Sequence, residues 1–185
     1  MTMAPRLRKV ALTAHITSSV GWLGSVAGFL ALAVAGLASQ DPQTVRAAYL
    51  GMELTGRYVI VPLNLASLLT GLVQSLGTTW GLFRHYWVLA KFLINVFATI
   101  ILLTFMQRGT LGYLAGAAAD TTLSSTDLLR VRSLAPVLHA GASLLLLLVA
   151  TTLGVYKPRG LTPYGWRKQH ELRAARGEYP GRADP

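Results

Sequence analysis

The sequence predicts an all-α fold, a bundle of four transmembrane helices. Hydrophobic residues make up 52% of the 185 positions and charged residues only 13%, whereas about a quarter of the residues in a soluble domain are charged. About 20 apolar residues suffice for a helix to cross a bilayer. No alternation of the kind found in membrane β-barrels is visible in runs such as residues 144–149. Four stretches are long enough to span: residues 10–38, 45–76, 86–106 and 133–156.

The ends of the first two spans carry recognisable signals. A basic N-terminus followed by an apolar run is similar to a secretory signal, but the run is nearly twice as long as a signal's apolar region, so we expect an uncleaved first span. Asp41 followed by Pro42 is typical of a helix N-cap with proline in the first turn, so the second helix should begin at Pro42. Pro62 and Pro136 lie inside the second and fourth stretches, where we expect kinks.

The connections and the tail are less apolar. Residues 110–126 are rich in small and polar residues and predict a loop with one helical turn, followed by a capping box at Ser124 and Asp127. Thr162 and Pro163 predict a short amphipathic tail helix over residues 163–176, with aromatic and basic side chains suited to lipid headgroups. Residues beyond Gly177 are expected to be disordered. The chain thus divides into residues 1–9, a membrane domain of residues 10–156, and a basic tail of residues 157–185.

The net charge of +10 predicts a contact with the bilayer surface and not with nucleic acid, because the basic residues flank the apolar spans. The absence of cysteine excludes disulfides and thiolate metal sites. By the positive-inside rule, we expect a multi-pass membrane protein with both termini cytoplasmic. Twelve basic residues then face inside, namely Arg6, Arg8, Lys9, Arg84, Lys91, Lys157, Arg159, Arg167, Lys168, Arg173, Arg176 and Arg182, against Arg46, Arg57, Arg108, Arg130 and Arg132 outside.

Polar residues within spans are costly and mark candidate sites. At 100° per residue, one stripe of the first span and one of the third carry polar groups at the same depth, so we expect His15 to contact the Lys91 stripe. Helix packing by His15 and a Lys91 side chain that extends to the headgroups are the alternatives. The two stripes are His15, Ser18, Ser19 and Trp22, and Trp87, Lys91, Asn95 and Ala98.

A second polar group lies toward the opposite face. Glu53 and Arg57 are four residues apart and should form an ion pair, with each other or with the side of the fourth span that carries His139. His15 and His139 differ in depth by roughly 17 Å, by helical rise, which is too far for one metal. The two stripes of this group are Arg46, Glu53, Arg57 and Asn64, and Arg132, His139 and Ser143.

No hydrolase, nucleotide-binding or zinc-protease motif is present in the chain. The segment from His15 to Gly24, His-Ile-Thr-Ser-Ser-Val-Gly-Trp-Leu-Gly, resembles the first helix of several bacterial membrane families. Over residues 7–170 the chain is most similar to an uncharacterised four-helix family of actinobacteria. This pattern, a His followed about two turns later by Trp-x-Gly, is also similar to one in copper-resistance D-like proteins and in the membrane protoporphyrinogen oxidase family that binds haem b.

In that oxidase family a first-helix His and a third-helix Lys matter, and the resemblance places these roles at His15 and Lys91. Other signature residues of the oxidase are missing, so its activity is not implied. One hypothesis is therefore a haem b or porphyrin site near the cytoplasmic leaflet, with His15 as axial ligand to the iron, Lys91 pairing a propionate or ligating, and Trp22 and Trp87 as walls.

Two alternatives stay open. In the first, the chain is a structural or assembly subunit of a larger membrane complex, and its polar residues only pack helices. In the second, small ions or solutes pass through an oligomer by way of Glu53, Arg57 and His139.

Overall fold

The computed structural model describes residues 3–78, 81–107, 110–120, 124, 126 and 132–175. Within these residues the fold is helical, and four helices are long and apolar enough to cross a membrane. The chain is thus a multi-pass membrane protein. Four expectations fall outside the described residues: the basic residues Arg108, Arg130, Arg176 and Arg182, the part of the capping box at Asp127, the end of the tail helix at residue 176, and the tail beyond Gly177.

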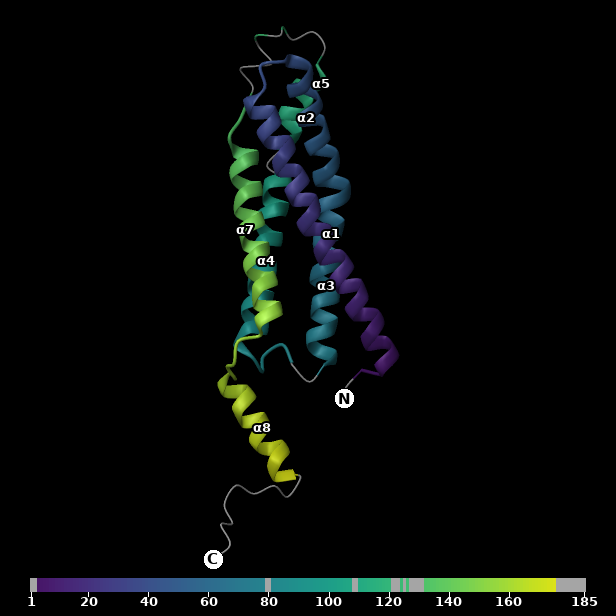
Figure 1. Ribbon diagram of the computed structural model, residues 1–185, viewed down its shortest axis with the longest axis vertical. Coiled ribbons are helices and arrows are strands. Elements are labelled where there is room, and N and C mark those ends of the chain that lie inside the picture. The colour runs from purple at the N-terminus through teal and green to yellow at the C-terminus, as the bar shows by residue number, and fades with distance from the viewer. Residues whose placement is uncertain are drawn as a thin grey trace, which may run out of the picture.

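Figure 1 shows the spans side by side and running alternately up and down, with α8 below them. The elements are α1 (Pro5–Ala38), α2 (Pro42–Thr55), the π-helical turn η1 (Gly56–Ile60), α3 (Val61–Gly77), α4 (Tyr86–Gln107), α5 (Thr110–Ala119), α7 (Ala135–Tyr156) and α8 (Pro163–Ala175). Elements α2, η1 and α3 form one continuous span over residues 42–77. The predicted start at Pro42 is confirmed, and the Asp41 carboxylate accepts hydrogen bonds from the amides of Gln43 and Thr44.

The two prolines lie in different settings. Pro136 lies in the first turn of α7, which begins at Ala135, so no kink forms. Pro62 is the second residue after η1, and the Val61 amide bonds to the Gly56 carbonyl, five residues back. A proline ring collides with the carbonyl four residues before it, and the wider π turn gives that carbonyl room. A π turn therefore accommodates Pro62 within the continuous span.

The expected loop at residues 110–126 is also wrong in its first part, because residues 110–119 form the ten-residue helix α5. Its alanines favour helix, and Leu114, Ala115 and Ala118 are buried. Helix α5 packs against α2, so its apolar face is covered by protein. Small residues are typical of loops, but here they allow two helices to approach closely.

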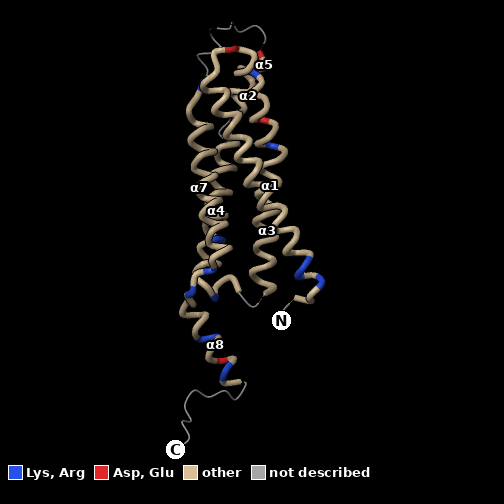
Figure 2. The backbone as a smooth tube through the Cα atoms, in the orientation of Figure 1, with Lys and Arg blue, Asp and Glu red and all other residues tan. Residues whose placement is uncertain are grey.

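The apolar core occupies the half of the bundle that includes α2 and α5. Its large side chains include Trp22, Phe29, Tyr49, Met52 and Phe105. Two arginines donate hydrogen bonds to main-chain carbonyls at this end. Arg132 donates to the carbonyls of Leu37 and Ser39, at the end of α1. Arg46 donates to the carbonyl of Asp120, after α5. Such donors satisfy carbonyls that a helix end leaves unpaired. In Figure 2 this end carries acidic and basic residues, whereas the other end is mostly basic, with one acidic segment in α8.

Candidate functional site

The opposite half of the bundle has a polar interior, and His15 lies within it. The His15 Nδ1 atom is 3.2 Å from the Ser67 carbonyl oxygen and 3.2 Å from Thr70 Oγ1. A carbonyl can only accept, and the Thr70 hydroxyl already donates to the Ala66 carbonyl at 2.6 Å. Nδ1 must therefore carry the proton, which leaves the Nε2 lone pair of neutral His15 available.

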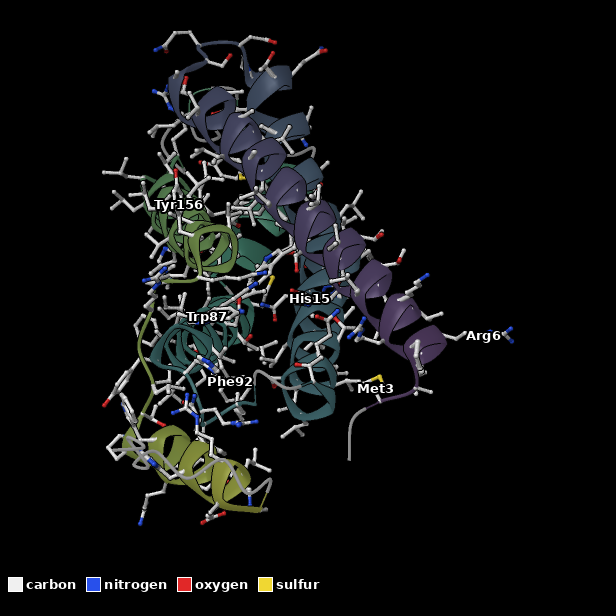
Figure 3. The ribbon with its side chains drawn as sticks, turned by 60° about the horizontal axis from the view of Figure 1, so that its bottom comes forward. Met3, Arg6, His15, Trp87, Phe92 and Tyr156 are labelled. Carbon is white, nitrogen blue, oxygen red and sulfur yellow. The ribbon has the colours of Figure 1, made fainter. Side chains whose placement is uncertain are left out.

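The position of the His15 ring depends on a glycine in α3. A Cβ atom added at Gly71 would lie 3.0 Å from His15 Cε1, which is tighter than almost any real contact. Beside the ring, the hydroxyls of Ser19 and Ser67 lie 2.7 Å apart and join α1 to α3. Figure 3 shows His15 on the part of α1 that lies against α3. His15 thus contacts α3, and its expected contact with the Lys91 stripe stays a prediction.

Lys91 lies on the other side of this interior. Its Nζ atom would be 3.2 Å from a Cβ atom added at Gly154 of α7. Helix α4 packs against α7 and α3, whereas α1 packs against α2, α3 and α7, so the two residues come from different walls. Within the described part of the chain, no carboxylate pairs with Lys91.

Two amide side chains of α3 also have buried polar atoms. Asn64 is fully buried at 0% exposure, and neither its Oδ1 nor its Nδ2 has a hydrogen-bond partner among the described residues. The Nε2 atom of Gln74 is also buried and has no hydrogen-bond partner among the described residues. A buried polar group without a partner costs about 1 to 3 kcal/mol. These atoms therefore favour a ligand or water molecules in this half of the bundle.

Asn64 does not share the face of Arg57, contrary to our expectation. Arg57 has 62% of its side chain exposed, whereas Asn64 is fully buried. The π turn between them adds about one residue to the helix, which rotates the later positions by roughly 100°. An uninterrupted α-helix would have kept the two residues on one face.

The two tryptophans of the haem hypothesis line different hollows. Trp22 is buried and lines an apolar cavity of about 40 Å³ beside the π turn, together with Phe105 and His139. Trp87 lines a cleft at the basic end of the bundle. The described residues therefore do not bring these rings into one pocket, and a site at His15 and Lys91 has other walls.

The residues of the second polar group also make separate contacts. Glu53 and Arg57 form the ion pair that their spacing predicts, with 2.6 Å between Oε1 and Nη2. His139 instead stacks on Phe105, with ring centroids 4.2 Å apart, and its Nδ1 lies 2.8 Å from the Ala135 carbonyl oxygen. The ion pair and His139 thus serve separate contacts and do not line a common path.

Metal chemistry is restricted by the small number of ligands. Among the described residues, no group of three His, Cys, Asp or Glu side chains could hold a metal ion. An ion at His15 would need most of its ligands from elsewhere, as a haem iron does from its porphyrin.

No known protein family, curated protein or solved structure matches this chain. The resemblance to haem-binding and copper-resistance families therefore stays a prediction.

The partners of His15 in α3 are not among the site residues predicted from the sequence. Ser67, Thr70 and Gly71 recur at spacings of three and four along the second span, which is the signal for one helical face. Read together with Asn64 and Gln74, this face predicts a polar contact for the first helix. That His15 itself makes this contact could be seen only in the three-dimensional arrangement.

Proposed function

We propose that this protein binds an anionic ligand within the membrane, between a wall of α1 and α3 and a wall of α4 and α7. The observation that carries the proposal is Lys91, a cation in a membrane span with no paired carboxylate in the described residues. A charge at that depth is costly without a partner, and the buried amide of Asn64 also lacks one. An anionic group that accepts hydrogen bonds satisfies both.

Haem b is the ligand that best fits these side chains. The Nδ1 proton of His15 is held by the Ser67 carbonyl, so the Nε2 lone pair is free to ligate iron, as in other proteins whose ligand histidines are oriented by a carbonyl. Lys91 and Asn64 are suited to bind propionate oxygens. Bound haem would supply one-electron redox chemistry, while these residues only hold and orient it.

We assign the chain to a bacterial plasma membrane, with both termini cytoplasmic. The resemblance to bacterial membrane families supports the choice of membrane. The gathering of basic residues at the end of the bundle that holds Met3 and α8 (Figure 2) supports the orientation, because cytoplasmic flanks are enriched in Lys and Arg. Alkaline phosphatase fused after Ser39 should be active and a fusion at the C-terminus inactive. Activity of the C-terminal fusion alone would reverse the orientation.

The absorbance spectrum of the purified full-length protein tests the ligand. A Soret band with about one haem per chain supports haem binding. If the band is missing after expression with added haem precursor, and the protein still co-purifies with other membrane subunits, the structural or assembly role replaces this proposal. The transport alternative has less support, because Arg57 is mostly exposed and pairs with Glu53 on a surface of the bundle.

A further inference from the structure

A cleft of about 840 Å³ opens at the basic end of the bundle, where α4 begins and α7 ends. It lies apart from the site at His15 and Lys91, and the proposed function does not use it. Its lining combines cations and indole rings from residues 84–87, around the start of α4, and from residues 157–169, which follow α7 and enter α8. Among the lining residues are Arg84, His85, Trp87, Lys157, Arg159 and Trp166.

The walls of the cleft are held together by main-chain contacts. The Thr162 amide donates to the Arg84 carbonyl at 3.1 Å, and the Tyr86 amide donates to the Gly160 carbonyl at 3.4 Å. The Thr162 hydroxyl also accepts from the Gly165 amide at 3.0 Å, which caps α8. A side chain at Gly165 would collide with the Arg84 carbonyl. The start of α8 is thus fixed against the turn before α4, and the cleft exists before any ligand binds.

The cleft has the charge of an anion site. Arg84, Lys157 and Arg159 line it, and none of the described residues in its lining is acidic. The described acidic residue of α8, Glu171, is bonded to Lys168 with 2.9 Å between Oε2 and Nζ. Guanidinium groups match the geometry of phosphate oxygens, and neighbouring ammonium groups add charge.

The depth of the cleft indicates which phosphate it takes. Tyr86 begins α4 and Tyr156 ends α7, and their side chains are exposed, as is that of Trp166. Tyrosine and tryptophan at span ends are typical of the headgroup layer. Just inside this layer, α4 and α7 present exposed apolar side chains such as Leu93 and Val155. Acyl chains can lie along this surface while a headgroup occupies the cleft.

We propose that this cleft binds the headgroup phosphate of an anionic phospholipid at the end of the bundle that bears the basic residues. Basic pockets between spans are a known way for membrane proteins to select such lipids. The cleft then fixes the tail helix to the bilayer through a specific lipid, in addition to its general attraction to negative surface charge.

Native mass spectrometry of the full-length protein in detergent tests the proposal. The protein is titrated with phosphatidylglycerol, with phosphatidylcholine of the same acyl chains, and with glycerol phosphate. We expect phosphatidylglycerol to bind about tenfold more tightly than phosphatidylcholine, and glycerol phosphate to compete weakly. Equal binding of the two lipids would overturn the proposal. Full competition by glycerol phosphate would assign the cleft to soluble phosphates instead.

A matched pair of variants locates the effect. The double variant Lys157→Gln and Arg159→Gln removes two exposed charges of the cleft, and it should lower phosphatidylglycerol affinity about tenfold. The control, Arg6→Gln and Arg8→Gln, removes two exposed charges from the start of α1, outside the cleft. An equal loss in the control would show that only general surface charge matters and would contradict the site. Arg84→Gln provides a third variant, expected to weaken binding in the same direction.

Discussion

His15 donates its Nδ1 proton to the main-chain oxygen of Ser67 across 3.2 Å, and this bond sets which nitrogen of the ring can act as a ligand. Because the acceptor is a main-chain carbonyl, no substitution at position 67 removes it while the helix stays intact. The orientation of His15 therefore depends on the packing of α1 on α3, for which Gly71 and the paired hydroxyls of Ser19 and Ser67 provide the close approach.

Gly71→Ala should destabilise the protein. The added methyl group meets His15 Cε1 at 3.0 Å, and overpacking of this kind costs about 1 to 3 kcal/mol. The control is Gly141→Ala in α7, where nothing lies within 4 Å of the added atom, and where a better helix former should stabilise by up to about 1 kcal/mol. Thermal unfolding in detergent measures both, and an equal gain in the two variants would contradict the packing of His15 on Gly71.

The contact of α1 with α2 can be tested by cross-linking, because the chain has no cysteine of its own. A Cβ atom at Gly36 would lie 3.2 Å from the Cβ of Ala48, near the separation that a disulfide spans. The double variant Gly36→Cys and Ala48→Cys should therefore oxidise almost completely. Gly28→Cys with Ala48→Cys places the first thiol two helical turns away and should not cross-link. Comparable oxidation of both pairs would refute this helix register.

Asp41 predicts a pH dependence at the start of α2. Hydrogen bonds from the Thr44 side chain, the Thr44 amide and the Gln43 amide hold the pKa of this exposed carboxylate below its ordinary value. A lowered folded-state pKa contributes stability that is present above the unfolded pKa and lost as the pH falls through the folded pKa. The temperature at the midpoint of thermal unfolding should thus decrease once the pH is lowered below about 4.

Asp41→Asn keeps a capping side chain but cannot titrate. The difference between the wild-type and Asp41→Asn midpoints should be constant from pH 7 to pH 5 and should shrink as the pH is lowered further toward 2. A constant difference over the whole range would mean that the Asp41 contacts do not act on its ionisation.

Glu53 and Arg57 should behave as one unit. Glu53→Ala leaves the Arg57 guanidinium without its counter-charge, so this variant should unfold at a lower temperature than the double variant in which Arg57→Ala is added. The two single variants and the double variant, unfolded thermally in the same detergent, form the complete cycle. Strictly additive losses would show that the pair seen at 2.6 Å does not couple energetically.

The apolar pattern was enough to predict the four spans, because bilayer thickness leaves few lengths open and because Asp41 and Pro42 mark a helix start chemically. The same pattern could not predict α5, since runs of Ala and Gly suit a loop as well as a close helix contact. It also could not predict η1, whose one added residue turns Asn64 away from Arg57. The sequence predicts the depth of His15 and Lys91 along their helices, but the pattern of helix neighbours depends on packing that the sequence alone does not reveal.

The most direct test of the central claim compares absorbance spectra of two histidine variants of the purified protein, His15→Ala and His139→Ala. Both residues lie in membrane spans, but only His15 is oriented toward the polar interior by α3, whereas His139 stacks on Phe105. The account predicts a Soret band in the wild type and in His139→Ala, and its loss or clear shift in His15→Ala. A band that is unchanged in His15→Ala, or a wild-type protein that takes up no haem, would contradict it.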